Sequence, residues 1–597
     1  MTNRMRFHAC FLLLNVISGF QAYARQTTKC DTTEAERAEV MRRTLESLEN
    51  EYEFLPGSLS FPPFAQPAGR YGLVAFDGKV VNPPALCEIT SRVDTPYGPG
   101  LCNYSFVLGP RDAVVGLFCT PPPVKYFSLR SYTGFRFRPQ AWLPAVELAD
   151  PDNNLTFNTT GRLPREGPYL QGKREGSAES DAAPFCRTAA FVSTGDGVTA
   201  RDVRRALANA GWAATATNLD VVSAEKAYFR DVRRPWAIDR SDAFVINYRV
   251  SQPIDSAAVA PYFASSYPFY MLRHRPEVSS ATSNRELGNA SGAPAQATLP
   301  TSGYLNMAPG GNLGHLPDIE DENAPREPLT TPPLRPRGTG QDESYLLPTL
   351  ARLEEAVTAY MGRSRGAVLH ARWEMEHILP DTQRCLTEPD YFPIAASVPE
   401  WNLTGFATCG FFSRDCLYTF LSPPTTGKVD YGDLTFPRNR SFVFLGANQV
   451  GLEKVTYSNI FMTATAEPQK QGRTVNFSAQ ALEGSANWFL PEDPEAKDLF
   501  AVTLTRDDCR QGVLVKDGRR GGALSTDEAF CTTVSEGVLS YEEFVYIVER
   551  KYLEPATQIG PDPDEVLPPV VLVFESPNIT GLGFERDAER MEAMARF

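Results

Sequence analysis

The hydrophobic residues of this chain recur mostly in short runs and in alternating stretches, which is the pattern of β-strands. Between residues 71 and 137 they alternate with polar residues or form brief runs bounded by Gly and Pro. Eight further strand-like runs cover residues 243–250, 268–272, 368–373, 442–445, 455–461, 499–504, 544–548 and 570–574. The pattern therefore predicts a protein built largely from short strands.

A few segments have the three- or four-residue spacing of amphipathic helices instead. Residues 33–52 begin with the spacing of a capping box and continue with a stripe of apolar residues. Residues 350–361 show a similar stripe. Residues 189–222 predict a strand, a helix capped by Thr199 and ended by Gly211, and a second strand.

The composition changes in the middle of the chain. Residues 276–343 are rich in Ser, Gly, Pro, Ala and Asn and lack periodicity, so we expect a flexible linker there. A chain of 597 residues is also too long for one hydrophobic core, since single domains rarely exceed roughly 300 residues. We predict an α+β fold of mainly antiparallel sheets with a few packed helices, divided into an N-terminal domain (25–275) and a C-terminal domain (344–597).

The N-terminus has the three parts of a secretory signal peptide. Two arginines precede an apolar stretch, residues 9–20, which is too short to span a bilayer that needs about 20 residues. Ala22 and Ala24 are the small residues that signal peptidase accepts, so residues 1–24 are the predicted signal. A buried N-terminal helix fits this tripartite pattern less well. We expect no membrane insertion of the mature form.

The cysteine count agrees with export. Of 11 Cys, one lies in the predicted signal, and the remaining ten form an even number that favours disulfide bonds. Cys87 with Cys102 and Cys509 with Cys531 would close short loops, although the sequence leaves the pairing open. No two cysteines have C-x-x-C spacing, which argues against a zinc ribbon or a thioredoxin-type redox site.

Asn-x-Ser/Thr sequons for N-glycosylation are spread along the chain. They lie at Asn103, Asn154, Asn158, Asn289, Asn402, Asn439, Asn476 and Asn578. Their number fits a eukaryotic secretory route, and every site that is used must lie on the surface. The sequence therefore predicts a secreted or extracellular glycoprotein, or one held in the lumen of the secretory pathway.

Charge and the known cofactor motifs exclude several classes of function. The chain has 58 basic and 72 acidic residues, a net charge of −14. It lacks the long basic block with which a protein neutralises phosphates and releases their counterions, so no nucleic-acid partner is predicted. It has no P-loop, no dinucleotide-binding glycine motif after a strand and no EF-hand loop, so no cofactor is predicted.

Two sequence patterns resemble catalytic or metal-binding templates but lack their context. Residues 362–366 match G-x-S-x-G, yet a helix precedes the serine and a strand follows it, the reverse of a nucleophile elbow. This order favours a turn that ends a helix. His370 and His377 lie seven residues apart without an obvious third ligand, which favours interfacial histidines over a metal site. No metal is predicted.

A glycine-rich bend lies beside two arginines near the end of the linker. Its residues are Arg337, Gly338, Thr339 and Gly340, whose backbone N–H groups could cradle an anion. The plainer interpretation is a rigid exit from the linker, because Pro and Gly by themselves explain the bend.

One pattern, Tyr-x3-Arg-x-Tyr, occurs once in each half. Its residues are Tyr126, Arg130 and Tyr132 in the first half and Tyr546, Arg550 and Tyr552 in the second. On a strand, the three side chains of each motif share a face. An arginine between phenol rings is suited to binding a carboxylate or a sugar, and Glu554 would extend the second face. Alternatively, the arginines fasten two sheets together. In either case the repeat suggests that the halves are related and pack pseudo-symmetrically.

Four segments resemble those of a family of uncharacterised algal and bacterial proteins. They are residues 126–132 (YFSLRSY), 337–340 (RGTG), 455–459 (VTYSN) and 552–560 (YLEPATQIG). The resemblance covers most of the chain outside the linker and the sequons; it implies a shared fold and carries no known activity. The family has Asn-His where this chain has Asn448-Gln449, so the resemblance transfers no catalytic histidine to this position.

These observations predict an exported protein that binds a small anionic or sugar-like ligand, or an extracellular partner. The candidate ligand-binding residues are Arg130, Tyr132, Arg550, Tyr552 and Glu554. The alternative is a secreted hydrolase or lyase, with the arginines holding an anionic substrate and Tyr132 or Tyr552 acting as acid or base with Glu554. If the five side chains line one concave pocket, a ligand site is supported; fully packed positions would assign them to architecture. A structural matrix protein is a third option, although the chain lacks the repeats typical of that class.

Overall fold

The computed structural model describes residues 30–275 and 325–576 with gaps, the longest of which are 88–100, 159–184, 389–412, 422–433 and 507–529. The described residues up to 275 are called the N-terminal half below, and those from 336 to 576 the C-terminal half. The predicted signal peptide and the sequons at Asn154, Asn289, Asn402 and Asn578 lie outside the described residues.

The strands of the N-terminal half form one 13-stranded sheet, the N sheet, whose main path is β11-β10-β5-β13-β1-β3-β12-β6-β7. Their bounds are β1 (Tyr52–Ser60), β2 (Ala65–Gln66), β3 (Gly69–Phe76), β4 (Phe106–Val107), β5 (Ala113–Cys119), β6 (Val124–Phe137), β7 (Ala141–Trp142), β8 (Val146–Glu147), β9 (Thr156–Asn158), β10 (Thr188–Thr194), β11 (Thr217–Val221), β12 (Asp242–Pro253) and β13 (Tyr267–His274). The sheet curls until its distant strands meet: the backbone N–H of Ser131 on β6 donates to Asp220 on β11 at 3.0 Å.

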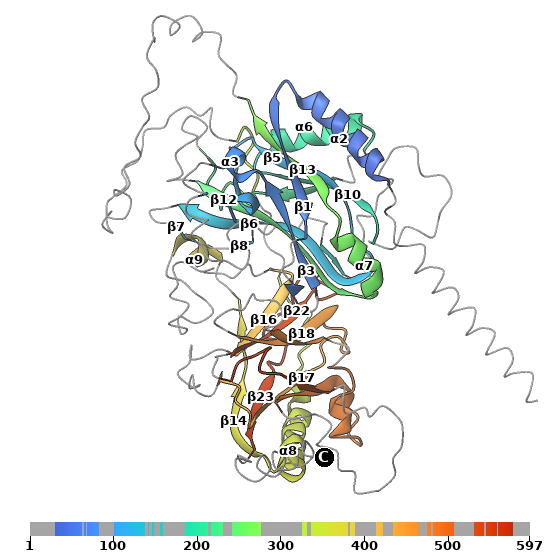
Figure 1. Cartoon of the computed structure of the whole chain (residues 1–597), viewed down its shortest axis with the longest axis vertical. Helices are drawn as coiled ribbons and strands as arrows, with labels where there is room; N and C mark the ends of the chain where they lie inside the picture. Colours follow the sequence, from blue (N-terminus) through green and yellow to red (C-terminus); the bar gives the residue numbers. More distant parts are fainter. Residues whose placement is uncertain are drawn as a thin grey trace, which may run out of the picture.

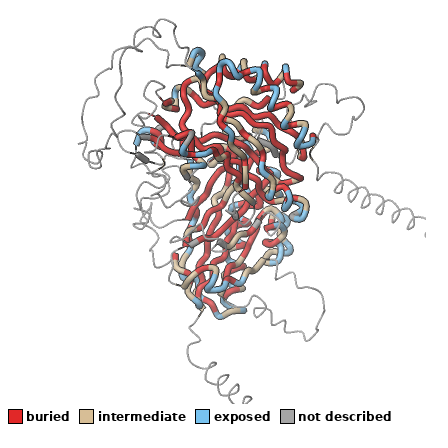
Figure 2. Tube along the Cα trace, turned by 45° about the horizontal axis from the view of Figure 1, so that its top comes forward, coloured by how far each residue is buried: buried red, intermediate tan, exposed pale blue. Residues whose placement is uncertain are grey.

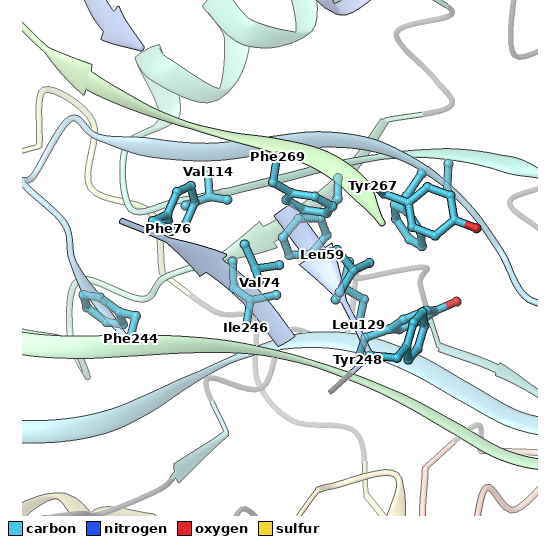
Figure 3. Close-up of a cluster of buried hydrophobic side chains, with 14 of the residues drawn as sticks. Leu59, Val74, Phe76, Val114, Leu129, Phe244, Ile246, Tyr248, Tyr267 and Phe269 are labelled. Atoms are coloured by element: carbon cyan, nitrogen blue, oxygen red, sulfur yellow. The ribbon is translucent and has the colours of Figure 1, made fainter. Parts of the chain in front are cut away.

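The inside of the curled sheet is the larger of its two cores (Figure 3). The ring of Phe118 on β5 lies 5.5 Å from that of Tyr248 on β12, although three strands separate β5 from β12 in the sheet. β5 is apolar on both of its faces. Its Val114 and Phe118 enter the inner core, whereas Val115 and Leu117 lie on the outer face under two helices.

Those helices are α2 (Glu34–Leu48) and α6 (Gly197–Asn209), which lie side by side over one face of the N sheet (Figure 1). The predicted capping box is confirmed, because Thr33 Oγ1 accepts from the Glu36 N–H and the Glu36 carboxylate accepts from the Thr33 N–H. The predicted cap of α6 is wrong. Asp196, not Thr199, begins the helix, and its carboxylate accepts from both the N–H and the hydroxyl of Thr199. The predicted end at Gly211 fits its left-handed φ of +97°.

The C-terminal half is built from two five-stranded sheets. The outer sheet has the order β14 (Val368–Glu374), β23 (Val570–Glu575), β17 (Arg440–Ala447), β20 (Leu499–Thr505) and β21 (Cys531–Thr533). The middle sheet has the order β15 (Glu376–Ile378), β16 (Cys416–Leu421), β22 (Val545–Tyr552), β18 (Tyr457–Ala464) and β19 (Thr474–Ser478). Among the described strand pairs only β10–β11 and β20–β21 are parallel, so the predicted mainly antiparallel fold is confirmed.

The middle sheet is buried on both faces, because it lies between the N sheet and the outer sheet (Figures 1 and 2). One face packs on the outer sheet through residues such as Ile460 and Ile547. The other face forms a cluster that includes Tyr126 of the N sheet. Helix α8 (Leu347–Arg365) covers the far side of the outer sheet. Two further helices are α7 (Ser256–Phe263) and α9 (Thr382–Thr387). Short helical turns α3 (Gly78–Val81) and α5 (Leu101–Tyr104) lie near β3.

Both described parts of the predicted linker are bound to one half or the other. In the first part, the N–H of Gly197 at the start of α6 donates to the Glu327 carbonyl at 2.8 Å, and the Leu329 N–H donates to the Gly195 carbonyl at 2.9 Å. In the second part, the Glu343 N–H donates to the Glu565 carbonyl at 3.1 Å. Residues 331–335 separate these two parts and lie outside the description.

Disulfide bonds are present in both halves. The predicted pair Cys87–Cys102 is bonded, and Cys30 is bonded to Cys119. In the C-terminal half, Cys385 and Cys531 are also disulfide-bonded. The expectation of ten bonded cysteines goes too far, because Cys186 and Cys416 keep their thiols and are buried in different halves.

The two template matches have the structures that their context predicts. Residues 362–366 end α8 with Gly366 in the left-handed region, and the Ser364 hydroxyl donates to the Tyr360 carbonyl at 2.6 Å. His370 and His377 lie on separate strands, β14 and β15. The described residues contain no cluster of three His, Cys, Asp or Glu side chains placed to hold a metal. Nor does any helix among them have the length and apolarity needed to cross a bilayer.

Candidate functional site

The two Tyr-x3-Arg-x-Tyr motifs meet where the N-terminal half contacts the C-terminal half. The first motif lies on β6 and the second on β22. Because side chains alternate along a strand, Tyr126 points out of the N sheet while its neighbour Phe127 enters the inner core. Tyr552 points out of the middle sheet in the same way. The two rings lie 4.4 Å apart, and the second face of Tyr552 stacks on Tyr457 at 5.6 Å.

A buried ion pair joins the halves beside these rings. Arg130 Nη2 lies 2.9 Å from Asp415 Oδ1, and the side chains are 7% and 0% exposed. The other carboxylate oxygen of Asp415 accepts from the Tyr126 hydroxyl at 2.9 Å. Asp415 therefore satisfies two groups of the first motif at once. The backbone carbonyl of Asp415 also accepts from Leu553 N–H at 2.8 Å, which fixes the position of the carboxylate relative to β22.

A third arginine, Arg249 on β12, belongs to the same interface although it lies outside both motifs. Its Nη1 donates to the Tyr418 hydroxyl at 3.3 Å, and its guanidinium lies 5.4 Å from the centre of the Tyr132 ring. Arg550 contacts its own sheet, over the ring of Phe461 at 4.5 Å. Tyr126, Arg130, Asp415, Tyr418 and Tyr552, together with Arg249, are called the interface cluster below.

Burial keeps the phenols of the interface cluster protonated near neutral pH. Burial raises the pKa of Tyr126 and of Tyr552 well above the ordinary value of 10, and neighbouring groups such as Asp415 and Tyr418 add to the shifts. Both phenols therefore stay protonated, and that of Tyr126 donates to Asp415. As whole residues, Tyr126, Arg130, Tyr132 and Tyr552 are only 1%, 6%, 1% and 2% exposed, so they are packed as architecture that fastens the halves together.

Glu554 does not join the second motif, although it follows Tyr552 by two residues. Leu553 between them has φ +52°, which ends the alternation of the strand. Glu554 turns instead toward Lys454, whose Nζ lies 3.1 Å from its Oε1, and accepts from the Thr557 hydroxyl at 2.9 Å. Glu554 therefore lies apart from the other four candidate ligand-binding residues, which lie on β6 and β22.

The glycine-rich bend cradles an anion that belongs to the protein itself. The N–H groups of Thr339 and Gly340 donate to the two carboxylate oxygens of Glu565 at 2.9 and 2.5 Å. Lys454 also contacts this carboxylate. Burial alone would raise the pKa of Glu565, but the hydrogen bonds from Lys454 and from the two N–H groups outweigh it, so the pKa is lowered. Arg337 donates to the carbonyls of Pro561 and Arg414 at 3.1 Å each. The bend is therefore a rigid exit from the linker that is fastened to the C-terminal half.

A second buried polar group lies inside the C-terminal half, on the opposite face of the middle sheet. His377 on β15 lies opposite Thr419 on β16, which lies opposite Glu549 on β22. His377 Nδ1 is 2.9 Å from Thr419 Oγ1, and its Nε2 is 2.8 Å from the Val566 carbonyl. Lys551 Nζ donates to Thr419 Oγ1 at 2.8 Å and contacts Glu549. These four side chains form a relay across three strands.

The partners of the relay fix the proton positions. A carbonyl only accepts, so Nε2 of His377 carries the proton and Nδ1 accepts from the Thr419 hydroxyl. Burial, aided by the nearby charge of Lys551, lowers the pKa of His377 to about 4. The imidazole is thus neutral at physiological pH. Sequence patterns could not reveal this group, because its members are spread over residues 377–551.

We expect the relay to make the protein less stable in acid. The ordinary pKa of histidine, 6.5, describes the unfolded chain, and the folded value is about 4. Above pH 6.5 the histidine is unprotonated in both the folded and the unfolded state. As the pH falls from 6.5 to 4, only the unfolded state binds a proton there, and the free energy of unfolding decreases by about 2–3 kcal/mol. Urea unfolding of the wild type and of His377→Gln between pH 8 and 4 should show this extra loss in the wild type only. Parallel curves would refute the assignment.

Comparisons with known proteins add little to this geometry. Neither a protein-family model nor a curated protein matches the chain. One solved structure, described as the VPA0106 protein from Vibrio parahaemolyticus, aligns with 90% of this chain and 96% of its own, at 10% identity and a TM-score of 0.30. A likeness at this level supports no conclusion about fold or function.

Proposed function

We propose that the chain is an exported, N-glycosylated binding protein whose ligand, sugar-like or anionic, or whose extracellular partner contacts its outer surface. The observation that carries this proposal is the burial of the interface cluster, which joins both halves into one body and offers none of its groups to solvent as a reactive site. Binding then falls to exposed side chains on a rigid scaffold. The repeated motif on β6 and β22 also leads us to propose that the two halves are related.

The sequons whose side chains are described are compatible with glycosylation. Asn103 is exposed, and Asn439 and Asn476 are half-buried, so none of the three is enclosed in a core. Asn459 donates to the Asn476 side-chain oxygen at 2.6 Å, which leaves the Asn476 nitrogen as the atom for a glycan. Disulfides in both halves support the same route through an oxidising compartment, secreted or luminal.

The experiment that tests the proposal follows the complete chain, with its leader, through a eukaryotic secretion host. We expect protein in the medium, cleaved after Ala24. Enzymatic glycan release in heavy-oxygen water should mark Asn103, Asn439 and Asn476 by conversion to labelled aspartate. Native mass spectrometry of this material should reveal bound ligand as added mass. Retention in the cell with unmodified sequons would overturn the proposal.

A hydrolase is the second candidate, and one observation favours it. In the relay, Thr419 and His377 have the hydrogen bond of a nucleophile and its base, and the Val566 carbonyl orients the imidazole. As Thr419 Oγ1 attacked an ester carbonyl, its proton would pass to His377 Nδ1 and then to the departing alcohol. The complete burial of Thr419 ranks this candidate below binding. Acetylation of Thr419 by p-nitrophenyl acetate, detected by peptide mass spectrometry, would reverse that order.

A further inference from the structure

The C-terminal half carries an exposed tryptophan at the side of helix α8. Trp488 ends the short helical turn η6 (Ala486–Trp488) and is 40% exposed, one of a few large apolar side chains of the described residues that reach solvent. Its ring lies 4.7 Å from that of Tyr360 on α8 and 4.6 Å from that of Phe489, at interplanar angles of 88° and 85°. Tyr360 and Phe489 also meet edge to face, at 5.6 Å and 80°. We infer that these three rings form a saccharide-binding platform on which one sugar ring stacks against Trp488.

The platform is held rigidly before any ligand arrives. Tyr360 and Phe489 pack against the core between α8 and the outer sheet, so their rings are fixed. The turn that carries Trp488 is closed by the N–H groups of Phe489 and Leu490, which both donate to the Ala486 carbonyl at 3.0 Å. Ala486 itself is fully buried. A ring fixed in this way loses little conformational entropy on binding, which favours it as an anchor.

An exposed amide side chain adjoins Trp488 in the sequence, and an ion pair lies further along α8. Asn487 precedes Trp488 and is exposed. Arg352 lies eight residues before Tyr360 on α8, about 12 Å along the helix axis. Its Nε donates to Asp493 at 3.0 Å. This hydrogen bond lowers the pKa of the Asp493 carboxyl and outweighs desolvation, which raises it, so the carboxyl stays ionised. Asn487 therefore supplies an exposed amide donor and acceptor next to Trp488 in the sequence.

The size of the patch argues for a small ligand and against a protein partner. Within the trio only Trp488 is exposed, and Tyr360 and Phe489 are half-buried. A stable protein interface needs about 800 Å² on each side, far more than one indole ring supplies. A pyranose ring has an apolar C–H face of comparable size and a polar rim, which matches an exposed aromatic ring next to the exposed amide of Asn487. This inference deepens the proposed binding function and rests on it.

Calorimetry of the full chain tests the platform with four probes: the β-1,4-linked hexaoses of glucose, xylose, mannose and N-acetylglucosamine. We expect at least one to bind, with a Kd that rises about tenfold or more in Trp488→Ala, as for loss of an aromatic anchor. Trp488→Phe should keep part of the affinity. Ile254→Ala, which removes an apolar side chain 64% exposed in the other half, should not change it.

The outcomes separate this inference from the proposed function. Equal affinity of the wild type and Trp488→Ala, with both proteins folded by circular dichroism, overturns the platform and leaves a saccharide-binding protein with another site. If none of the four hexaoses binds the wild type, the platform is also overturned, while export and sequon occupancy still decide the proposed function.

Discussion

Replacing Asp415 by alanine should lower the free energy of unfolding by about 3–5 kcal/mol, because it leaves the guanidinium of Arg130 buried without its carboxylate. Arg130 and Asp415 are 7% and 0% exposed, so water cannot replace the lost partner. The hydroxyl of Tyr126 loses its bond to the same carboxylate. Urea unfolding of the full chain, followed by circular dichroism, measures the change.

Two variants control this prediction. Asp415→Asn keeps an oxygen acceptor without the charge and should fall between the wild type and the alanine variant. Glu39→Ala removes an ion pair with Arg42 on the exposed face of α2, where the side chains are 43% and 54% exposed, and should change stability little. If Asp415→Ala were as mild as Glu39→Ala, the buried ion pair would not hold the halves together.

Removal of the Cys30–Cys119 disulfide should produce the second large effect. The bond joins the segment before α2 to the end of β5 and closes a loop with a sequence separation of 89 residues. A loop of that length corresponds to about 4–5 kcal/mol of stabilisation through the unfolded state. The Cys87–Cys102 bond closes a separation of only 15 residues, which corresponds to about 3 kcal/mol.

The two disulfides provide matched controls for each other. Cys30→Ala/Cys119→Ala and Cys87→Ala/Cys102→Ala each remove two sulfur atoms, so their difference reports mainly the loop length. We expect the lower midpoint of chemical unfolding for the Cys30–Cys119 variant. The reverse order would contradict the account of how these bonds stabilise the protein.

Local patterns predicted most of the elements and few of their contacts. The apolar runs at residues 570–574 and 499–504 became β23 and β20, and the Thr33–Glu36 box begins α2, since these signals depend on neighbours in the sequence. The same alternation correctly placed Tyr126 and Arg130 on one face of β6. That this face meets β22 depends on how two sheets pack, which no local pattern contains.

The site residues that were missed share this cause. Asp415 lies just before β16 and has no pattern of its own, yet it supplies the carboxylate for Arg130. Glu554 was grouped with Tyr552 on the assumption of a continuous strand, and the left-handed Leu553 breaks that strand. The N–H of Thr339 in the glycine-rich bend donates to the carboxylate of Glu565, more than 200 residues away, and no local pattern contains this contact.

The interface cluster makes one body of the two halves, and cleavage of the connecting chain tests this most directly. A protease site placed within residues 331–335 separates the linker part bound to α6 from the part bound to the C-terminal half. The disulfides Cys30–Cys119 and Cys87–Cys102 lie within the N-terminal half, and non-reducing gels would exclude a covalent link between the fragments. After cleavage we expect both fragments to elute together from a sizing column at the volume of the uncut protein, and to separate when Asp415→Ala is introduced. Separation of the unmutated fragments would contradict the account.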